Sequence, residues 1–523
     1  MTTLLARSTP ALAAKELSFA AAPAVMESLR KQGLKIVQCH GTFDLVHPGH
    51  IIHFEEARAL GDVLVVTITA ARFVNKGPGR PVFDDAMRTK ALAALSIVDY
   101  VVVVPHVAAV EAIECIRPDI YCKGREYENP ENDATGNIRD DVATVARLGG
   151  EVRYVGSVVF SSSKLINRSL GAVSKLANDR CRALAETWSP TQFRDAVDSF
   201  SKLRVLTIGD VIFDRYTYVH VQGLTSKNRT ISARKLEEET HAGGVLAIVR
   251  HMSAFCDHVD LLSLTGTEPW VDSLLGEYLG DSTRHMVRHP DFTTVVKQRF
   301  VEHGKRSTEI NKLFAVNFIN KESPSADVEE RVCRKVREVI KNYDLVVVAD
   351  FGHGLLLPKV RELVQAEAPL LALNCQTNSF NHGYNLINRQ YQRADFVSLD
   401  EQELMLATGL RFPDFPAELV KLGRSFGCRA AWLTRGAEES IGWDSATGGI
   451  SRMPPLENQV VDTVGAGDAF FAAVSLAGAA GLPHELATFI GQLAGAQAVR
   501  IPGNREAIRK EILVRGGMSL LNQ

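Results

Sequence analysis

Short apolar segments alternate with amphipathic helical segments along most of the chain. The first series of strand candidates comprises KIVQC, DVLVVTIT, VDYVVVV, DIYCK and EVRYVG, all rich in β-branched residues and bounded by turn residues. A second series starts at LRVLTIGD (203–210) and continues through HVDLLSL, YDLVVVAD, PLLALN, ADFVSL and CRAAWLT. Because apolar strands separated by helices are typical of parallel sheets with crossover helices, the pattern predicts two α/β domains.

The same pattern predicts where the domains begin and end. Residues 1–32 are expected to form an alanine-rich tail and a leading helix, and residues 33–169 the first domain. Residues 170–202 are polar, helical in pattern and interrupted by a Ser-Pro pair, which predicts a helical connector. Residues 203–523 then form the second domain.

Composition narrows the class of protein. The chain has 523 residues, 46% of them hydrophobic and 23% charged, as expected of a soluble protein with more than one core. The 59 basic and 61 acidic residues are mixed, so no broad basic surface for nucleic acid is expected. No segment approaches the roughly 20 apolar residues that span a bilayer. The eight cysteines are scattered without a CxxC pair, which favours a reduced, cytoplasmic protein.

The first candidate site follows the strand KIVQC, where a glycine-threonine turn leads into a His-Pro-Gly-His motif (47–50). Backbone N–H groups of Gly41, Thr42 and Phe43, together with the positive end of the following helix, can hold phosphates. His47 and His50 lie one helical turn apart and can face the same ligand. Their donors would stabilise charge on an α-phosphate and on departing pyrophosphate.

Two other interpretations of these histidines stay open at this stage. His47, His50 and His53 have a regular three-residue spacing that a metal site could use, although no further ligand is marked in the sequence. They could also be ordinary surface residues of a helix, which leaves the coincidence of strand, turn and motif unexplained.

The segment from about Gly33 to Arg168 resembles the HxGH nucleotidyltransferase superfamily. Besides the histidine motif, the resemblance rests on GRPVFDDAMRTKALAAL (79–95), IRPDIYCKGREYE (116–128) and VVFSSSKLINR (158–168), which follow the order found in the adenylyltransferase half of bifunctional heptose kinase/adenylyltransferases. It implies a Rossmann-like fold and a set of roles. Thr42, His47 and His50 would handle the triphosphate, Lys76 and Arg88 would contact phosphates, Lys123 would lie by the substrate, and Ser161 and Ser162 would cap a late helix against the nucleotide.

The second candidate site is VVDTVGAGDAFFAAV (460–474), in which the turn Gly465-Ala466-Gly467 delivers Asp468 at the start of an apolar helix. Small residues let consecutive N–H groups approach an anion, and the helix start adds positive potential. A carboxylate held there can accept a proton from a sugar hydroxyl while the turn neutralises a phosphoryl group in transfer. A glycine-rich turn before a buried helix would explain the glycines but leaves Asp468 without a role.

DTVGAGDAF matches the signature of the ribokinase-like, PfkB-type carbohydrate kinases, and the likeness extends from about Leu203 to the end of the chain. GDVIFDRYTY (209–218), LEEETHAGG (236–244) and VVVADFGHGLL (346–356) resemble the heptose 7-phosphate kinase branch. The resemblance implies an α/β sandwich that binds its sugar under a small β lid. The implied sugar-side residues are Asp210, Asp214, Gly243 and Gly244, with Lys297 and Arg299 for a phosphate already on the sugar; Thr434 and Gly436 lie on the ATP side, and Asp400 and Glu403 order Mg²⁺-bound water.

The sequence departs from the family pattern at several places. KGREY (123–127) replaces a KGGDY-like turn, and three serines replace a serine-threonine-threonine run. Asp400 stands where the kinases have asparagine, and Ala247 occupies the position of an asparagine that ordinarily hydrogen-bonds sugar hydroxyls. These changes lie in or near the predicted acceptor pockets, so the nature of the acceptor stays open.

Together the motifs predict a bifunctional sugar-activating enzyme, similar to the heptose enzymes but with reversed domain order: transferase first, kinase second. The kinase would use ATP and Mg²⁺ on a sugar, a heptose phosphate or a related sugar phosphate, and the transferase would use ATP or CTP, less readily GTP, on a sugar 1-phosphate. The expected partners are these small molecules and a second copy of the chain through the kinase domain. Two other functions stay open: a cytidylyltransferase for a non-sugar alcohol phosphate, and one active domain regulated by the other.

Overall fold

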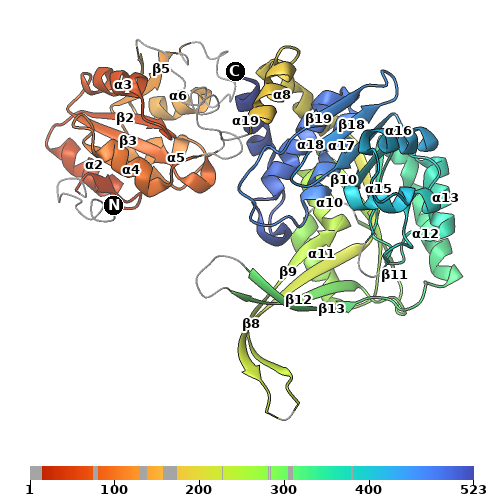
Figure 1. Ribbon diagram of the computed structural model, residues 1–523. Helices are drawn as coiled ribbons and strands as arrows, with labels where there is room; N and C mark the ends of the chain where they lie inside the picture. Colours follow the sequence, from red (N-terminus) through yellow and green to blue (C-terminus); the bar gives the residue numbers. More distant parts are fainter. Residues whose placement is uncertain are drawn as a thin grey trace. The chain divides into compact units, whose positions relative to one another are not determined.

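A computed structural model describes residues 14–522 except 75–80, 126–127, 129–137, 157–173, 227, 281, 283, 304–309 and 378–380. The chain divides into two compact units: unit 1 contains residues 1–193 and 514–523, and unit 2 contains residues 194–513. Each unit is an α/β structure built on its own sheet (Figure 1), which confirms the predicted fold class. No described helix has the length and apolar character needed to cross a membrane.

Unit 1 is built on a six-stranded sheet in which every strand pair is parallel. Its strands, in the order β1-β4-β3-β2-β5-β6, are β1 (Glu16–Leu17), β4 (Tyr100–Val104), β3 (Val63–Thr69), β2 (Ile36–Gly41), β5 (Ile120–Gly124) and β6 (Glu151–Val155). The order reverses at β2, which has β3 on one side and β5 on the other. In open parallel sheets such a reversal opens a crevice at the carboxyl ends of the strands, where ligands bind.

Helices cover both faces of this sheet. The helical segments up to β6 are α2 (Ala22–Lys31), α3 (Pro48–Arg58), η1 (Ala71–Phe73), α4 (Asp85–Ala93), α5 (Val110–Ile116) and α6 (Ile138–Arg147), and α8 (Lys175–Ala185) follows after β6. Phe54 of α3 and Leu92 of α4 pack in one apolar cluster with Val37, whereas Met26 of α2 packs in another with Ile36. Because neighbouring residues of β2 point to opposite faces, one short strand supplies both clusters.

Unit 2 has a nine-stranded core sheet. Its strands, in sheet order, are β11 (Arg284–Arg288), β10 (His258–Thr265), β7 (Arg204–Gly209), β14 (Leu345–Asp350), β15 (Leu371–Cys375), β16 (Phe396–Asp400), β17 (Ala430–Thr434), β18 (Ser440–Asp444) and β19 (Ile450–Met453). The pairs from β11 to β17 are parallel, and β18 and β19 add an antiparallel edge. Every residue of β14 is buried, as expected for a central strand covered on both faces.

The helices of unit 2 form a layer on each face of this sheet. They are α9 (Pro190–Asp198), η4 (Ser199–Lys202), α10 (Val245–Ser253), α11 (Pro269–Leu279), α12 (Ala326–Val339), η5 (Ile340–Asn342), α13 (Pro358–Glu367), α14 (Ile387–Gln390), α15 (Glu401–Thr408), α16 (Phe415–Phe426), α17 (Ala466–Ala479), α18 (His484–Ala498), η6 (Pro502–Asn504) and α19 (Lys510–Leu521). α12 shows why they pack: Val328, Val332, Val336 and Val339 recur at helical spacing and are buried in the core of the unit. α9 and α19 each cross the boundary between the units.

A separate four-stranded sheet forms the predicted lid of unit 2 (Figure 1). Its strands, in the order β13-β12-β8-β9, are β13 (Ile310–Phe318), β12 (Val295–His303), β8 (Val211–Leu224) and β9 (Ile231–Gly244). β8 follows β7 with only Asp210 between them, so the lid grows directly out of a central core strand. The lid face that carries Asp214, Lys297 and Arg299 is set by strand alternation.

We expect the core of unit 2 to respond strongly to a lost aromatic ring. Phe489 of α18 is 0% exposed, whereas Phe412 is 87% exposed. Phe489→Ala should lower the free energy of unfolding by about 3–5 kcal/mol, because it removes apolar contact and leaves a cavity. Phe412→Ala should change it by about 0.5 kcal/mol or less. Urea denaturation followed by tryptophan fluorescence tests the pair, and equal effects of the two substitutions would contradict the packing described.

Candidate active sites

One cavity of unit 2 brings together the elements of the predicted kinase site. Its volume is about 290 Å³. Nine predicted residues line it: Asp214, Gly244, Lys297, Arg299, Asp400, Glu403, Gly465, Gly467 and Asp468. They come from the lid, from the carboxyl end of β16 and from the turn before α17. The cavity therefore collects groups that are up to 254 positions apart in the chain.

The turn before α17 is fixed by a very close approach. Gly465 is the N-cap of α17 with φ +83°, and Ala466 begins the helix. A Cβ on Gly465 would lie 1.6 Å from Oδ1 of Asn504, so only glycine fits. The carboxylate of Asp462 braces the turn, since it accepts hydrogen bonds from the backbone N–H of Val464 and Gly503, both at 3.1 Å.

Asp468 lies in the first turn of α17 and is 9% exposed. Nε2 of Gln376 donates a hydrogen bond to its Oδ1 at 3.1 Å. Burial, together with the negative charge of Asp214, raises the pKa of Asp468 to about 7, although the Gln376 hydrogen bond and the charge of Lys297 lower it in part. A carboxylate that titrates near neutrality is suited to accept a proton from a hydroxyl and later release it.

The lid supplies two cations to the cavity. Arg299 forms an ion pair with Asp214, and its guanidinium lies 5.4 Å from the ring centroid of Tyr216. Burial lowers the pKa of Lys297, although the charges of Asp214, Asp210 and Asp468 oppose this shift. Among the described residues Lys297 forms no ion pair, and its side chain lines the cavity, where it can contact a ligand.

Asp210, Gly243 and Gly244 lie where the lid strands join the core, and of these three residues only Gly244 lines the cavity. The Asp210 carboxylate accepts hydrogen bonds from the backbone N–H of Phe351, His353 and Leu355, at 3.2, 3.1 and 3.2 Å. Burial raises its pKa to about 6, and these three donors act against that shift. The two glycines permit close contacts: a Cβ would lie 2.3 Å from Asp214 Oδ2 at Gly243, and 2.7 Å from the Asp210 carbonyl oxygen at Gly244. A sugar contact by Asp210 stays a prediction, because its carboxylate already accepts hydrogen bonds from the backbone of the loop after β14.

Asp400 and Glu403 form a capping box at the start of α15. The Asp400 carboxylate accepts a hydrogen bond from Glu403 N at 2.7 Å, and Glu403 accepts one from Asp400 N at 2.9 Å. Burial and the adjacent Asp400 raise the pKa of Glu403 to about 8. A nearby cation would favour the ionised form of both side chains.

Three other positions of the kinase prediction lie elsewhere. Thr434 ends β17, where its hydroxyl donates to the Leu399 carbonyl at 3.4 Å, and Gly436 follows in a turn with φ +51°. Neither is among the described residues that line the cavity, so their ATP-side role stays a prediction. Ala247 lies buried in α10 and also does not line the cavity.

The sequence did not single out several lining residues. Gln376 and Thr377 follow directly after β15, and Phe351 follows β14. Because ligands bind at the carboxyl ends of parallel strands, these positions could have been predicted as lining residues from the strand ends alone. Asn504 lies after α18 in a Pro-Gly-Asn turn with φ +57°. Asn504 meets Gly465, which lies 39 positions earlier in the chain, and no local sequence pattern predicts this contact.

In unit 1 the predicted phosphate turn lies at the carboxyl end of β2. Gly41 ends the strand, Phe43 has φ +45°, and His47 is the N-cap of α3. The His47 and His50 rings stack with centroids 3.9 Å apart, and the edge of Phe43 packs 5.1 Å from His50. Burial lowers the pKa of His47. Among the described residues, no three His, Cys, Asp or Glu side chains converge as they would around a metal ion.

Arg88 and Lys123 lie in different environments within unit 1. Arg88 is 1% exposed, and its guanidinium donates to the carbonyls of Thr42 at 2.7 Å and Thr69 at 3.0 Å. It therefore supports the phosphate turn from beneath, and a direct phosphate contact stays a prediction. Lys123, at the carboxyl end of β5, pairs with Asp141 at 3.0 Å. Lys76, Ser161 and Ser162 lie outside the described residues.

Comparison with known proteins agrees with this geometry. Residues 202–511 match the family model described as pfkB family carbohydrate kinase. The fold and cavity of unit 2 are thus those of a carbohydrate kinase, and the chain belongs to the pfkB family. Residues 39–168 match a model described as cytidylyltransferase-like, so the transferase-like segment precedes the kinase in this chain.

Curated relatives match a part of the chain. Proteins described as "Bifunctional protein HldE" from Methylobacillus flagellatus and Syntrophotalea carbinolica are 37% and 42% identical over 149 residues, which cover 28% of this chain and 29% of each relative. The corresponding protein of Koribacter versatilis is 36% identical over 168 residues, 32% of this chain and 33% of its own length. The chain therefore spans about a third or less of the relatives it matches.

Solved structures cover unit 2. Phosphofructokinase-2 from Escherichia coli in complex with fructose-6-phosphate has a TM-score of 0.47 at 16% identity, covering 59% of this chain and 97% of that one. Arabidopsis thaliana ribokinase complexed with ribose and ATP has a TM-score of 0.44 at 20% identity, covering 61% and 99%.

The two glycines of the turn offer a matched test of its geometry. Gly465→Ala should lower the melting temperature and weaken phosphate binding, because the new Cβ meets Asn504 and the backbone has a positive φ. The expected loss of stability is about 1–3 kcal/mol. A Cβ at Gly467 meets nothing within 4 Å, so Gly467→Ala should keep the melting temperature nearly unchanged. Calorimetry of both variants measures their melting temperatures. An unchanged melting temperature in Gly465→Ala would show that the contact with Asn504 does not restrict position 465 to glycine.

Proposed function

We propose that the chain is a bifunctional sugar-activating enzyme. Its pfkB unit would transfer the γ-phosphoryl group of ATP to a sugar, a heptose phosphate or a related sugar phosphate. Unit 1 would transfer a nucleotidyl group to a sugar 1-phosphate and release pyrophosphate. The observation that carries the proposal is the single cavity in which Asp468, the Gly465–Gly467 turn and the lid cations Lys297 and Arg299 lie together.

In the kinase reaction, Asp468 accepts the proton of the sugar hydroxyl while the hydroxyl oxygen attacks the γ-phosphorus of ATP. The bond from the γ-phosphorus to the β–γ bridging oxygen breaks, and ADP leaves. Backbone N–H groups of the turn and the positive start of α17 stabilise the charge on the phosphoryl oxygens. Little covalent chemistry is required of the protein, so positioning and charge stabilisation account for most of the rate. An intact base and anion-binding turn favour an active kinase over a silent regulatory domain.

The lid cations support a substrate that already carries a phosphate. Lys297 offers a charge without an ion-pair partner among the described residues, and Arg299 is held in place by Asp214. A guanidinium fixed in this way presents its remaining donors to phosphate oxygens. The change to Ala247 removes a neutral sugar-binding amide from the pattern, which is consistent with recognition through charge.

The residues present also fit Mg²⁺. Asp400 and Glu403 offer carboxylate oxygens at the cavity wall, and Mg²⁺ is usually held by one or two carboxylates together with water and substrate phosphates. The ion would shield the phosphate charges of ATP. Glu403 and Asp400 would hold it through water, as their capping hydrogen bonds already fix both side chains.

In unit 1, a phosphate oxygen of the sugar 1-phosphate would attack the α-phosphorus of the nucleotide, and pyrophosphate would leave. His47, His50 and the N–H groups from Gly41 to Phe43 would stabilise the charge that moves to the departing group. The 36–42% identity with proteins described as bifunctional supports this assignment. ATP or CTP is the proposed donor, and the reversed domain order relative to the heptose enzymes is part of the proposal.

We also propose that the kinase unit forms a homodimer through its lid. Phe314, Val316 and Phe318 recur at every second position of β13 and are 52%, 41% and 44% exposed. Residues spaced by two share one face of a strand, so they form an apolar stripe on an edge strand of the lid. Exposed apolar stripes of this kind mark protein interfaces.

Separate substitutions should divide the two activities. Asp468→Asn is expected to reduce phosphorylation by about 10²–10⁴-fold, because it removes the proton acceptor, while nucleotidyl transfer continues. His47→Ala combined with His50→Ala should have the opposite effect. ADP and pyrophosphate release, measured across ATP, CTP, GTP and UTP with heptose, hexose and glycerol phosphates, tests both variants. Retained phosphorylation in Asp468→Asn would refute the assigned base.

The pH dependence of phosphorylation should report on Asp468. Its pKa is raised to about 7 by burial, and only the ionised form accepts a proton, so kcat/KM should fall as the pH drops below about 7. Lys297→Met removes a charge that lowers this pKa, so the midpoint should move to higher pH. Arg334→Gln on the exposed side of α12 serves as the control. An unchanged midpoint in Lys297→Met would contradict the proposed coupling.

A further inference from the structure

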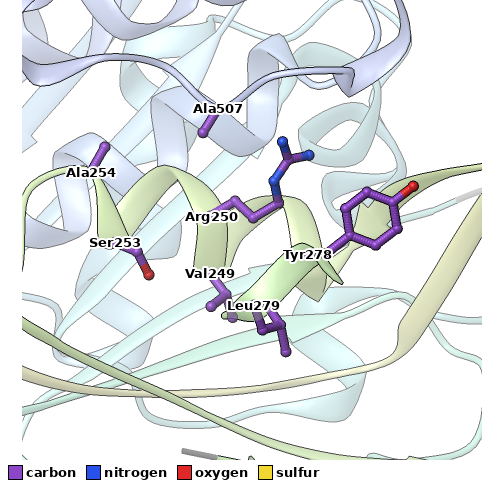
Figure 2. Close-up of a pocket in the computed structure, with 7 residues that line it drawn as sticks. All are labelled: Val249, Arg250, Ser253, Ala254, Tyr278, Leu279 and Ala507. Carbon is purple, nitrogen blue, oxygen red and sulfur yellow. The ribbon is translucent and has the colours of Figure 1, made fainter. Parts of the chain in front are cut away.

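A second hollow of unit 2 lies at the carboxyl-terminal end of α10, apart from the residues that line the kinase cavity. Its volume is about 290 Å³, at the lower end of the usual range for small-molecule sites. The described residues that line it are Val249, Arg250, Ser253, Ala254, Tyr278, Leu279 and Ala507 (Figure 2). They come from α10, from α11 and from the segment that follows η6.

Arg250 provides the charge of this hollow. Its two terminal nitrogens donate to the backbone carbonyls of Asn504 at 3.1 Å and Arg505 at 3.0 Å. Its guanidinium lies 5.5 Å from the ring centroid of Tyr278. Among the described side chains no carboxylate forms an ion pair with Arg250, and burial lowers its pKa. The Glu506 carboxylate, which pairs with Arg509 at 2.8 Å, also acts on Arg250 and raises its pKa. The hydrogen bonds that hold the Arg250 guanidinium go to neutral carbonyl oxygens, so an approaching anion would stabilise this half-buried cation.

The remaining lining residues indicate what kind of ligand the hollow would suit. Leu279, Ala254 and Ala507 provide the apolar surface of the hollow, and the Val249 side chain lies fully buried behind it. Ser253 contributes a hydroxyl group. Figure 2 shows the Arg250 guanidinium and the Tyr278 ring directed away from the Val249 and Leu279 side chains. The hollow thus combines a charged group with an apolar wall, which suits an organic anion better than a bare inorganic ion.

The contacts of Arg250 lead to the kinase site and to the lid. Asn504, whose carbonyl it holds, packs its side chain against Gly465 of the anion-binding turn. Arg505, the second residue it holds, donates to Tyr218 Oη at 3.0 Å and pairs with Glu239 at 2.5 Å, both on lid strands. The Tyr278 hydroxyl donates to the Thr240 carbonyl of β9. One side chain therefore lies between the hollow, the turn and the lid.

We propose that this hollow is a binding site for a small organic anion, a carboxylate or phosphate ester with an apolar body, and that its occupant is coupled to the kinase site through Arg250. The anion pairs with the guanidinium while the apolar body lies against Leu279, Ala254 and Ala507. Because Arg250 also holds Asn504 and Arg505, the occupant restrains the segment that shapes the turn and contacts the lid.

Ligand-observed NMR on the full chain tests the site with benzoate and phenyl phosphate as anions with an apolar body. Benzamide is the neutral analogue of benzoate, and inorganic phosphate lacks the apolar body. Benzoate and phenyl phosphate should bind at least about tenfold more tightly than benzamide and phosphate. If benzoate and benzamide bind equally, the negative charge has no role. If inorganic phosphate binds as tightly as phenyl phosphate, the apolar wall has no role.

Variants separate this site from binding elsewhere. Arg250→Gln should weaken benzoate binding at least about tenfold by removing the charge. Ala507→Leu should also weaken benzoate binding, because the larger side chain fills the hollow. This variant leaves the hydrogen bonds of Arg250 in place, so it still tests the site if Arg250→Gln fails to fold. Arg334→Gln, an exposed arginine of α12, should bind like the parent protein. Unchanged binding in Ala507→Leu would overturn the location.

Hydrogen–deuterium exchange measures the coupling without any assumption about the reaction. Benzoate should slow amide exchange in residues 501–508 and in the β9 segment 237–244 of the parent protein, and it should not do so in Arg250→Gln. Binding that leaves exchange in both segments unchanged would overturn the coupling and leave only a binding site.

Discussion

The contact between Gly465 and Asn504 is the steric constraint on which the kinase site depends. Oδ1 of Asn504 occupies the space that any side chain at position 465 would need, so glycine is required there, and Gly465 has a positive φ at the wall of the cavity. Asp468 then lies less than one helical turn away and meets Gln376 from the end of β15. A single close approach between distant segments thus fixes the glycine turn at the cavity wall and the position of Asp468 next to it.

Both units place their chemistry at the same kind of location, the carboxyl ends of adjacent parallel strands. In unit 1 the phosphate turn leaves β2, and Lys123 lies at the end of β5. In unit 2, Asp210, Phe351, Gln376 and Asp400 lie at the ends of β7, β14, β15 and β16, which are neighbours in the sheet. The order of the strands therefore decides which residues meet.

The sequence predicts the repetitive and local parts of this structure well. All eleven apolar segments form strands, because buried β-branched runs bounded by turns have few alternatives. The motifs also predict which residues line the kinase cavity from the turn, the lid and β16. The sequence could not predict Asn504 or Gln376, whose places depend on contacts across the fold. Nor could it predict that Asp210 and Arg88 would be held by backbone N–H groups and carbonyls, since such bonds leave no pattern in side-chain identity.

Asp210 stands between the last residue of a rigid core strand and the first residue of the lid, and its carboxylate holds the loop that begins at Phe351. The outgoing strand β8 and the returning strand β9 meet there, since Val245 N donates to the Asp210 carbonyl at 3.3 Å. The backbone and side chain of this one residue therefore join the core strand, both ends of the β8–β9 hairpin and the loop that contributes Phe351 to the cavity.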